Sequence, residues 1–217
     1  TGLGGIADII DSPDGASIAV GYQYYVPAPS TAPAVVARVL RLRDGAVVAE
    51  LLGTQSVNAL RFSPDGSSLA FGAEYAAAEL WRVRAGGAWL PTPVRRVWTA
   101  ETSTTRALAF GPDGATMVAV GDEHVTVLDT AAQRAPLVTI ETVGSPSGAL
   151  GWGGGGSVEF SPAGDQLAVG ARGVVRVWAL RRQSLARRID GTRGVAAFSP
   201  DGATLATSGP GDTLRLW

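Results

Sequence analysis

Few side chains in this sequence belong to the types that perform catalysis or hold metal ions. The 217 residues include no cysteine and a single histidine, His124, which leaves no basis for disulfides, thiolate metal sites or a histidine-rich metal centre. His124 follows Asp122 and Glu123, and carboxylates beside an imidazole are able to bind a metal ion or transfer protons. The three residues stand immediately before an alternating run that starts at Val125, so a solvated turn is the simpler interpretation. We therefore predict no catalytic residue, no metal site and no cofactor.

Two further groups of residues could bind a ligand, but each also has a simpler structural explanation. The glycine run 153–156 lacks the Lys-Ser/Thr ending of a P-loop and precedes a strand-like segment instead of a helix, so phosphate binding is not favoured. Four arginines flank one predicted hairpin and would suit an acidic partner: Arg181, Arg182, Arg187 and Arg188. Exposed charges that prevent strand edges from pairing account for them as well.

Aromatic residues in two long predicted loops are the strongest candidates for partner binding. The loops span residues 22–34, which also hold three prolines, and residues 141–156. Rigid aromatic side chains bury large areas at a low cost in conformational entropy, which makes them good interface anchors. The candidates are Tyr22, Tyr24, Tyr25 and Trp152. The alternative is that the tyrosines pack on a neighbouring strand and that the glycine run is a flexible spacer.

Composition places the chain among globular proteins with a sizeable core. Hydrophobic residues make up 46% of the chain and charged residues 17%. The net charge is −1, with 18 basic and 19 acidic residues, which argues against a nucleic-acid surface. No apolar run approaches the roughly 20 residues that span a bilayer. We expect no nucleic-acid or membrane partner and a cytoplasmic location.

Five related segments organise the whole chain. Each is a variant of Phe-Ser-Pro-Asp-Gly. In such a segment the proline ring holds φ at about −65°, Asp bonds to its own backbone and Gly accepts a positive φ. Short apolar, β-branched runs stand on both sides, so each segment is predicted to be a turn between antiparallel strands. Five similar turns indicate a repeat architecture. The segments are residues 11–15, 62–66, 110–114, 160–164 and 198–202.

The units agree strand by strand. The strand after each turn has small residues between larger ones, as in 69–72, which suits a strand buried on both faces. A third run alternates, as in 175–178, and predicts a half-exposed strand. A fourth run, such as 185–189, follows in the first four units. Four strands per unit with almost no helix signal predicts an all-β protein of four-stranded antiparallel propeller blades.

This order of segments resembles the WD-repeat β-propeller family: Phe-Ser-Pro-Asp-Gly, a buried strand, a short turn and x-Val-x-Val-Trp. The resemblance covers essentially the whole chain and is best in the second, fourth and fifth units. It implies a multidomain protein or scaffold that binds proteins or peptides on the propeller faces, with seven blades as the usual number. It also implies that the two aromatic loops emerge on one face.

The sequence departs from the family pattern in several units. The family's Trp falls on Trp81, Trp178 and Trp217, but on Arg43 in the first unit and Leu128 in the third. The following Asp remains only as Asp44 and Asp129, and Gly-Thr replaces Gly-His before the first strand at 53–54 and 191–192. We therefore expect that the family's buried Asp-His-Ser/Thr-Trp network cannot form here and that the blades depend on apolar packing.

The resemblance also implies how the ring closes, with an outer strand supplied from the N-terminal end. Residues 1–5 are too short to supply it, so we expect the last five blades of a longer, seven-bladed propeller, and a five-bladed ring is the alternative. The expected blades are roughly 1–53, 54–102, 103–141, 157–191 and 192–217, the last without its outer strand, with an inserted loop at 142–156.

These features favour a non-enzymatic scaffold or sensor module that binds a protein, a peptide or another domain of its parent protein through the loop-decorated face. The alternative is a propeller-type enzyme or small-ligand binder that uses the channel mouth. That function would require polar side chains to converge there, and the candidates are Asp11, Asp122, Glu123 and His124. A cluster of carboxylates at the channel-facing strand ends would distinguish the alternative.

Overall fold

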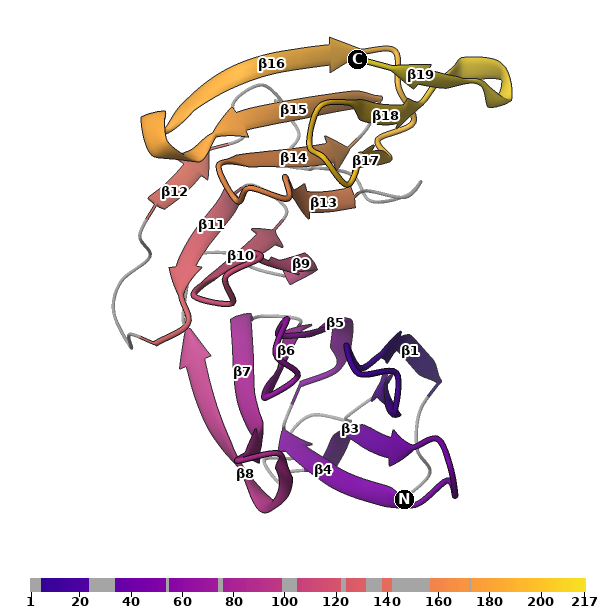
Figure 1. Ribbon diagram of the computed structural model, residues 1–217, viewed down its shortest axis with the longest axis vertical. Coiled ribbons are helices and arrows are strands. Elements are labelled where there is room, and N and C mark those ends of the chain that lie inside the picture. Colours follow the sequence, from indigo (N-terminus) through magenta and orange to yellow (C-terminus); the bar gives the residue numbers. More distant parts are fainter. Residues whose placement is uncertain are drawn as a thin grey trace.

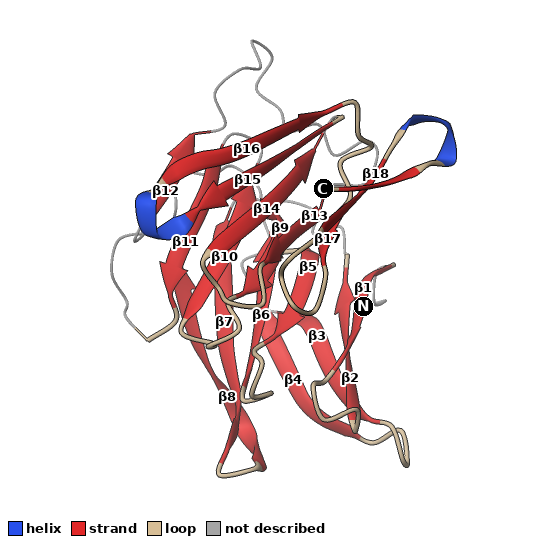
Figure 2. Cartoon of the chain, turned by 45° about the horizontal axis from the view of Figure 1, so that its top comes forward, coloured by secondary structure: helices blue, strands red, loops and turns tan. Residues whose placement is uncertain are grey.

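The computed structural model describes residues 5–23, 34–53, 55–73, 76–98, 105–121, 124–131, 138–141, 157–171 and 173–217. Regular structure in these ranges is almost entirely β-strand, and the helical part is limited to two short 3-10 turns, η1 (Leu180–Arg182) and η2 (Pro210–Asp212) (Figure 2). Within these ranges no helix has the length and apolar character to cross a membrane. The predicted all-β class is confirmed.

The strands form four four-stranded sheets and one three-stranded sheet, all antiparallel, and neighbours in each sheet are consecutive in the chain. The first sheet contains β1 (Ile6–Asp11), β2 (Ser17–Tyr22), β3 (Ala34–Arg41) and β4 (Val47–Gly53), and the second contains β5 (Val57–Phe62), β6 (Ser68–Ala73), β7 (Ala76–Ala85) and β8 (Ala88–Trp98). The third contains β9 (Thr105–Phe110), β10 (Thr116–Gly121), β11 (His124–Asp129) and β12 (Val138–Glu141). The fourth contains β13 (Ser157–Phe160), β14 (Gln166–Ala171), β15 (Val174–Ala179) and β16 (Ser184–Asp190), and the fifth contains β17 (Ala196–Phe198), β18 (Leu205–Ser208) and β19 (Leu214–Leu216).

The five sheets follow one another along an arc in chain order (Figure 1). The first strands contact one another from sheet to sheet: β1 contacts β5, β5 contacts β9, β9 contacts β13 and β13 contacts β17. The first and fifth sheets stand at the two ends of the arc, which does not close into a ring (Figure 1). This is the arrangement expected of an incomplete propeller.

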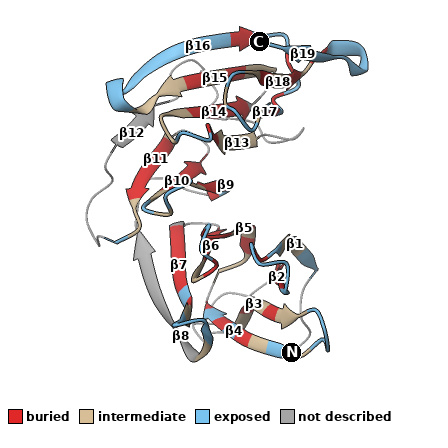
Figure 3. Ribbon diagram, viewed as in Figure 1, coloured by how far each residue is buried: buried red, intermediate tan, exposed pale blue. Residues whose placement is uncertain are grey.

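The second strand of each four-stranded sheet is buried on both faces, as its pattern of small and large residues predicts. Its central alanine is Ala19, Ala70, Ala119 or Ala168, and each is at most 1% exposed. An alanine leaves room for larger side chains from the sheets on either side. Of the described outer strands, β4 is partly exposed and β16 is exposed along almost its whole length (Figure 3).

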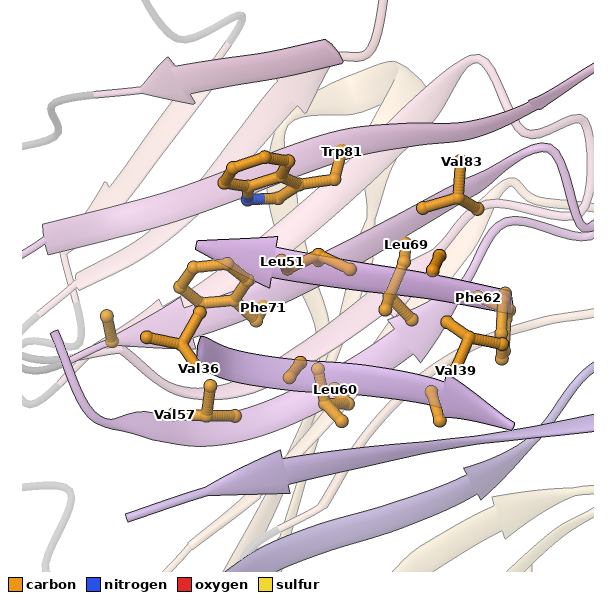
Figure 4. Packing of buried hydrophobic residues seen from close by; sticks show 14 residues of the cluster. Val36, Val39, Leu51, Val57, Leu60, Phe62, Leu69, Phe71, Trp81 and Val83 are labelled. Atoms are coloured by element: carbon orange, nitrogen blue, oxygen red, sulfur yellow. The ribbon is translucent and has the colours of Figure 1, made fainter. Parts of the chain in front are cut away.

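The largest apolar cluster joins the first two sheets. Val36, Val39 and Leu51 from the first sheet meet Leu60 and Phe71 from the second, and all five are fully buried (Figure 4). Full burial of one such side chain stabilises a fold by about 1.5–3 kcal/mol. This cluster therefore fixes the second sheet on the first.

Strand register corrects one sequence assignment. The tryptophans of the second, fourth and fifth sheets lie opposite the first apolar residue of the second strand, as Trp178 lies opposite Leu167. In the first sheet the residue in that position is Leu40, opposite Ile18. The prediction that Arg43 occupies the tryptophan position was wrong, because the long preceding loop makes the register of β3 impossible to count from the sequence. Asp44 consequently lies in the β3–β4 turn, where it accepts a hydrogen bond from Arg41 Nε at 3.0 Å.

The expectation that the tryptophan network is lost was partly wrong. In the fifth sheet Trp217 Nε1 donates to the Thr207 hydroxyl at 2.9 Å, which restores the Trp–Thr part of the network. In the second sheet Trp81 Nε1 donates instead to the buried Glu79 carboxylate at 3.1 Å. In the fourth sheet Trp178 Nε1 is buried and has no partner among the described residues.

The missing partner of Trp178 has a simple explanation. Thr207 pairs with Arg215, two residues before Trp217, and Val169 pairs with Arg176, two residues before Trp178. Val169 therefore stands where Thr207 stands in the fifth sheet, and it offers a methyl group where a hydroxyl would accept the indole N–H. A buried donor left without an acceptor costs about 1–3 kcal/mol.

Candidate interaction surfaces

The five turns share one hydrogen-bonded design at the ends of the first and second strands. In the second sheet Gly66 N donates to Ser63 O at 2.8 Å, and Ser68 N donates to Ser63 Oγ at 2.9 Å. Ser63 Oγ in turn donates to Asp65 Oδ1 at 2.6 Å, and Ser67 N donates to the same oxygen. Serine, aspartate and glycine thus each contribute to the turn itself.

Two turns keep this design with different residues. Gly111 replaces the serine of the third turn, and a Cβ atom there would lie 2.2 Å from Thr116 Oγ1, so the threonine hydroxyl takes the space of the missing side chain. Ala163 replaces the aspartate of the fourth turn, and Asp165 accepts the Ser161 hydroxyl at 2.9 Å instead. The turn geometry is therefore preserved in all five sheets.

The turn carboxylates are strongly held in their ionised form. Hydrogen bonds from the turn serines lower the pKa values of Asp14, Asp65 and Asp201, and bonds from the turn backbone act in the same direction. In each case the serine hydroxyl makes the largest contribution. The turn end of the molecule consequently carries fixed negative charge at neutral pH.

Successive turns lie side by side in one row. A Cβ atom placed on Gly66 would lie 3.6 Å from Pro13 Cδ, and one on Gly114 would lie 3.6 Å from Pro64 Cδ. The same proline-to-glycine contact recurs between the third and fourth turns and between the fourth and fifth. The predicted turns therefore gather at one end of neighbouring sheets, where they form a continuous surface.

An arginine fills the space between the first and second turns. Arg84, near the end of β7, donates from Nη1 to Asp14 Oδ2 at 2.7 Å. Its guanidinium carbon lies 3.9 Å from the centre of the Trp89 ring, a distance at which a cation is attracted to an aromatic face. Only 16% of the Arg84 side chain is exposed. A side chain of the protein itself thus closes this part of the surface.

A pocket of about 670 Å³ opens between the second and third turns. Two turns, three strands and the residues after β11 contribute to its walls. The lining includes the carboxylates of two turns, one exposed arginine and several apolar groups: Pro64, Asp65, Leu80, Arg82, Phe110, Pro112, Asp113 and Ala131. Sequence reasoning missed this pocket because its walls come from two different repeats. An alignment of the repeats on the tryptophan position would have indicated the pocket, since Arg84 stands three residues after Trp81 and Ala131 stands three residues after the equivalent Leu128.

The predicted aromatic anchors fall mainly outside the described residues. Tyr22 is the last residue of β2 and is only 9% exposed, so its ring offers little surface to a partner. Tyr24, Tyr25 and Trp152 lie outside the described residues, and their role stays a prediction.

The residues considered for metal or acid–base chemistry fall only partly within the described residues. Asp122 and Glu123 lie outside the described residues, whereas His124 begins β11. The described part of the chain contains no group of three or more His, Cys, Asp or Glu side chains that could hold a metal ion.

Carboxylates on the first strands bond across the boundaries between sheets. Asp8 Oδ2 accepts the backbone N–H of Leu60 at 2.9 Å, and Glu159 Oε2 accepts the backbone N–H of Phe198 at 3.2 Å. Burial raises the pKa of Glu159, although the Phe198 N–H acts in the opposite direction. These two carboxylates satisfy backbone donors of the next sheet.

The arginines of the fourth sheet lie on its outer side. Arg187 on the exposed strand β16 has its guanidinium carbon 5.2 Å from the centre of the Trp217 ring, and Arg188 Nη2 lies 2.8 Å from Asp190 Oδ1. Arg176 pairs with Arg188 across the strands, and burial together with the Arg188 charge lowers the pKa of Arg176. Contacts within the chain therefore engage part of this group.

Comparison with known proteins identifies the architecture. The family model described as WD domain, G-beta repeat matches residues 188–217, the segment that contains the fifth sheet and the Trp217–Thr207 bond. A chain in a crystal structure of a mitotic checkpoint complex superposes on 98% of this chain with a TM-score of 0.72 and 17% sequence identity. Residues 188–217 thus match a WD repeat, and the chain has the fold of a β-propeller. It spans 62% of the length of that solved chain, and its five sheets are blades, numbered here in chain order.

Proposed function

We propose that this propeller is a non-enzymatic interaction module that binds a protein or peptide partner through its loop-decorated face. WD-repeat propellers in general mediate contacts between proteins. The observation that carries the proposal is the use of Asp8 and Glu159 to bond backbone N–H groups of the next blade. Catalysis in a propeller channel would require such carboxylates to converge with free lone pairs.

The aromatic loops supply the binding part of the proposal. Tyr24 and Tyr25 follow β2, and Trp152 lies between the third and fourth blades in the sequence. In a propeller, the loops between second and third strands emerge on the same face as the connections between blades. Aromatic anchors that meet on one face are the type of residue that dominates binding energy at interfaces.

The test is the capture of partners by the combined variant Tyr24→Ala, Tyr25→Ala and Trp152→Ala. We expect proteins that the wild type captures from its parent cells to be lost, while the melting temperature changes by no more than about 2 °C, because loop residues contribute little to stability. The matched control is Val47→Ala with Leu185→Ala, which removes two exposed apolar side chains from outer strands. Equal capture by wild type and the aromatic variant would contradict the proposal.

A further inference from the structure

The pocket between the second and third turns corresponds to the space that Arg84 fills one blade earlier. In both places a turn aspartate stands on one side, Asp14 or Asp65, and the glycine of the following turn stands on the other. Gly66 contacts Pro13 of the preceding turn in the same way as Gly114 contacts Pro64. The two spaces are therefore built by equivalent backbone.

Backbone hydrogen bonds fix which residue replaces Arg84. Val83 N donates to Ser67 O at 2.9 Å in the second blade, and Thr130 N donates to Ala115 O at 3.0 Å in the third. Val83 and Thr130 therefore occupy equivalent positions, and the next residue is Arg84 in one blade and Ala131 in the other. The pocket exists where the arginine side chain has been replaced by a methyl group.

Asp65 retains the acceptor that Arg84 would engage. The pKa of Asp14 is lowered in part by Arg84, whereas the main groups that lower the pKa of Asp65 are Ser63, then Ser67 and its own backbone. Asp65 has no ion pair in the described part of the chain. Arg82 lines the same pocket but makes no ion pair with Asp65 there.

The other walls suit an arginine side chain. Leu80, Phe110 and the prolines of both turns offer apolar surface to a long aliphatic stem, and a planar guanidinium matches a carboxylate better than a compact ammonium does. The volume of about 670 Å³ also admits residues next to the arginine. Arg82 provides a donor for carbonyl oxygens of the same segment.

We propose that this pocket binds an arginine side chain from a peptide segment of a partner protein, with the guanidinium on Asp65 in the place that Arg84 takes on Asp14. In the next space along the row the equivalent residue is Arg181, which lies in η1 and makes no ion pair with Asp113 among the described residues. The pocket between the second and third turns is thus the place where an unpaired turn carboxylate faces an alanine. The inference does not depend on the aromatic loops.

The first test is an NMR titration of the full chain with N-acetyl-L-arginine amide and, in parallel, with N-acetyl-L-citrulline amide, whose urea group is neutral. We expect the arginine compound to shift the amide signals of Asp65, Gly114 and Ala131 saturably. The citrulline compound should bind at least about tenfold more weakly, because a charge-assisted hydrogen bond is lost. Equal binding of the two compounds, or shifts confined to other residues, would overturn the proposal.

Two variants probe the same pocket from the protein side. Asp65→Asn retains an oxygen for the turn donors but removes the charge, so we expect arginine binding to weaken about tenfold. Asp201→Asn makes the same change in the fifth blade and should leave binding unchanged. Ala131→Arg should place the protein's own guanidinium on Asp65 and abolish binding of the arginine compound. Undiminished binding to a folded Ala131→Arg variant would refute the assignment.

Loss of binding in these variants is distinguishable from failure of the proposed partner function. Partner capture is tested by substitutions at Tyr24, Tyr25 and Trp152, whereas the pocket is tested by substitutions at Asp65 and Ala131. If the aromatic variant still captures partners and Asp65→Asn does not, the pocket is the interaction site and the aromatic loops are not.

Discussion

The interface between the first two blades and the interface between the last two are built from different groups. Leu51, Leu60 and Phe71 fill the first interface with large, fully buried side chains. The last interface contains a smaller apolar cluster, in which Ala168, Val175 and Leu205 take part. Both interfaces contain a bond from a backbone N–H to a carboxylate, Leu60 N to Asp8 in the first and Phe198 N to Glu159 in the last. The last interface adds a bond from Ala196 N to Ser157 Oγ at 2.9 Å.

Backbone proximity explains the difference. A Cβ atom on Gly170 of the fourth blade would lie 2.0 Å from the carbonyl oxygen of Gly194. At the equivalent Gly21 of the first blade, the nearest atoms would belong to the side chains of Val57 and Leu60. At this position the last two blades therefore meet through main chain, whereas the first two meet through side chains. Apolar packing tolerates small shifts that a backbone contact does not.

The largest expected effect is the loss of an aromatic ring from the first interface. Phe71→Ala should lower the free energy of unfolding by about 3–5 kcal/mol, because the fully buried ring leaves a cavity that the surrounding strands cannot fill. The matched variant Phe198→Ala removes a half-buried ring from the last interface and should cost about half as much. Chemical denaturation of both variants measures the difference, and equal losses would show that the two interfaces do not differ in this way.

Alanine at the two equivalent glycines should give the next largest contrast. Gly170→Ala forces a methyl group against a backbone carbonyl, so we expect a loss of about 3 kcal/mol, while Gly21→Ala displaces only side chains and should cost about 1 kcal/mol. Hydrogen exchange of the fifth-blade amides gives a second measurement. Unchanged protection there in Gly170→Ala would contradict the close approach of Gly170 to Gly194.

Restoring a partner to Trp178 should stabilise the fourth blade. Val169→Thr places a hydroxyl where Thr207 accepts the Trp217 indole, and the expected gain is about 1 kcal/mol. The control is Val20→Thr in the first blade, where Leu40 occupies the tryptophan position. The hydroxyl has no indole to accept there, so this variant should lose about 1–3 kcal/mol. A loss in Val169→Thr as large as in the control would mean that the indole N–H of Trp178 is out of reach.

The sequence predicted the parts of the fold that depend on neighbouring residues. The turn segments and the buried second strands follow from local residue types, and the structure confirms them. The tryptophan position of the first blade was misplaced because register is set by pairing with Ile18 and not by distance along the loop. The Asp65 pocket was missed because its walls come from two repeats whose spatial contact no single repeat encodes. The aromatic anchors Tyr24, Tyr25 and Trp152 remain a prediction from the sequence.

The smallest expected contrast is that Asp14 and Glu159 change the stability of the fold with pH in opposite directions. The pKa of Asp14 lies below its ordinary value of 3.8, so its contribution is present above that pH and is lost as the pH falls further. The pKa of Glu159 lies above its ordinary value of 4.5 because of burial, so its contribution to stability is complete below pH 4.5 and is lost as the pH rises through the raised value.

Asp14→Asn should therefore lower stability at pH 7 by less than about 1 kcal/mol, since Asp14 is well exposed and screened by solvent. Glu159→Gln should instead leave stability at pH 7 unchanged or slightly raised. Urea unfolding of both variants against wild type from pH 3 to pH 8 would measure the two differences, and slopes of the same sign would contradict the distinction between the two interfaces.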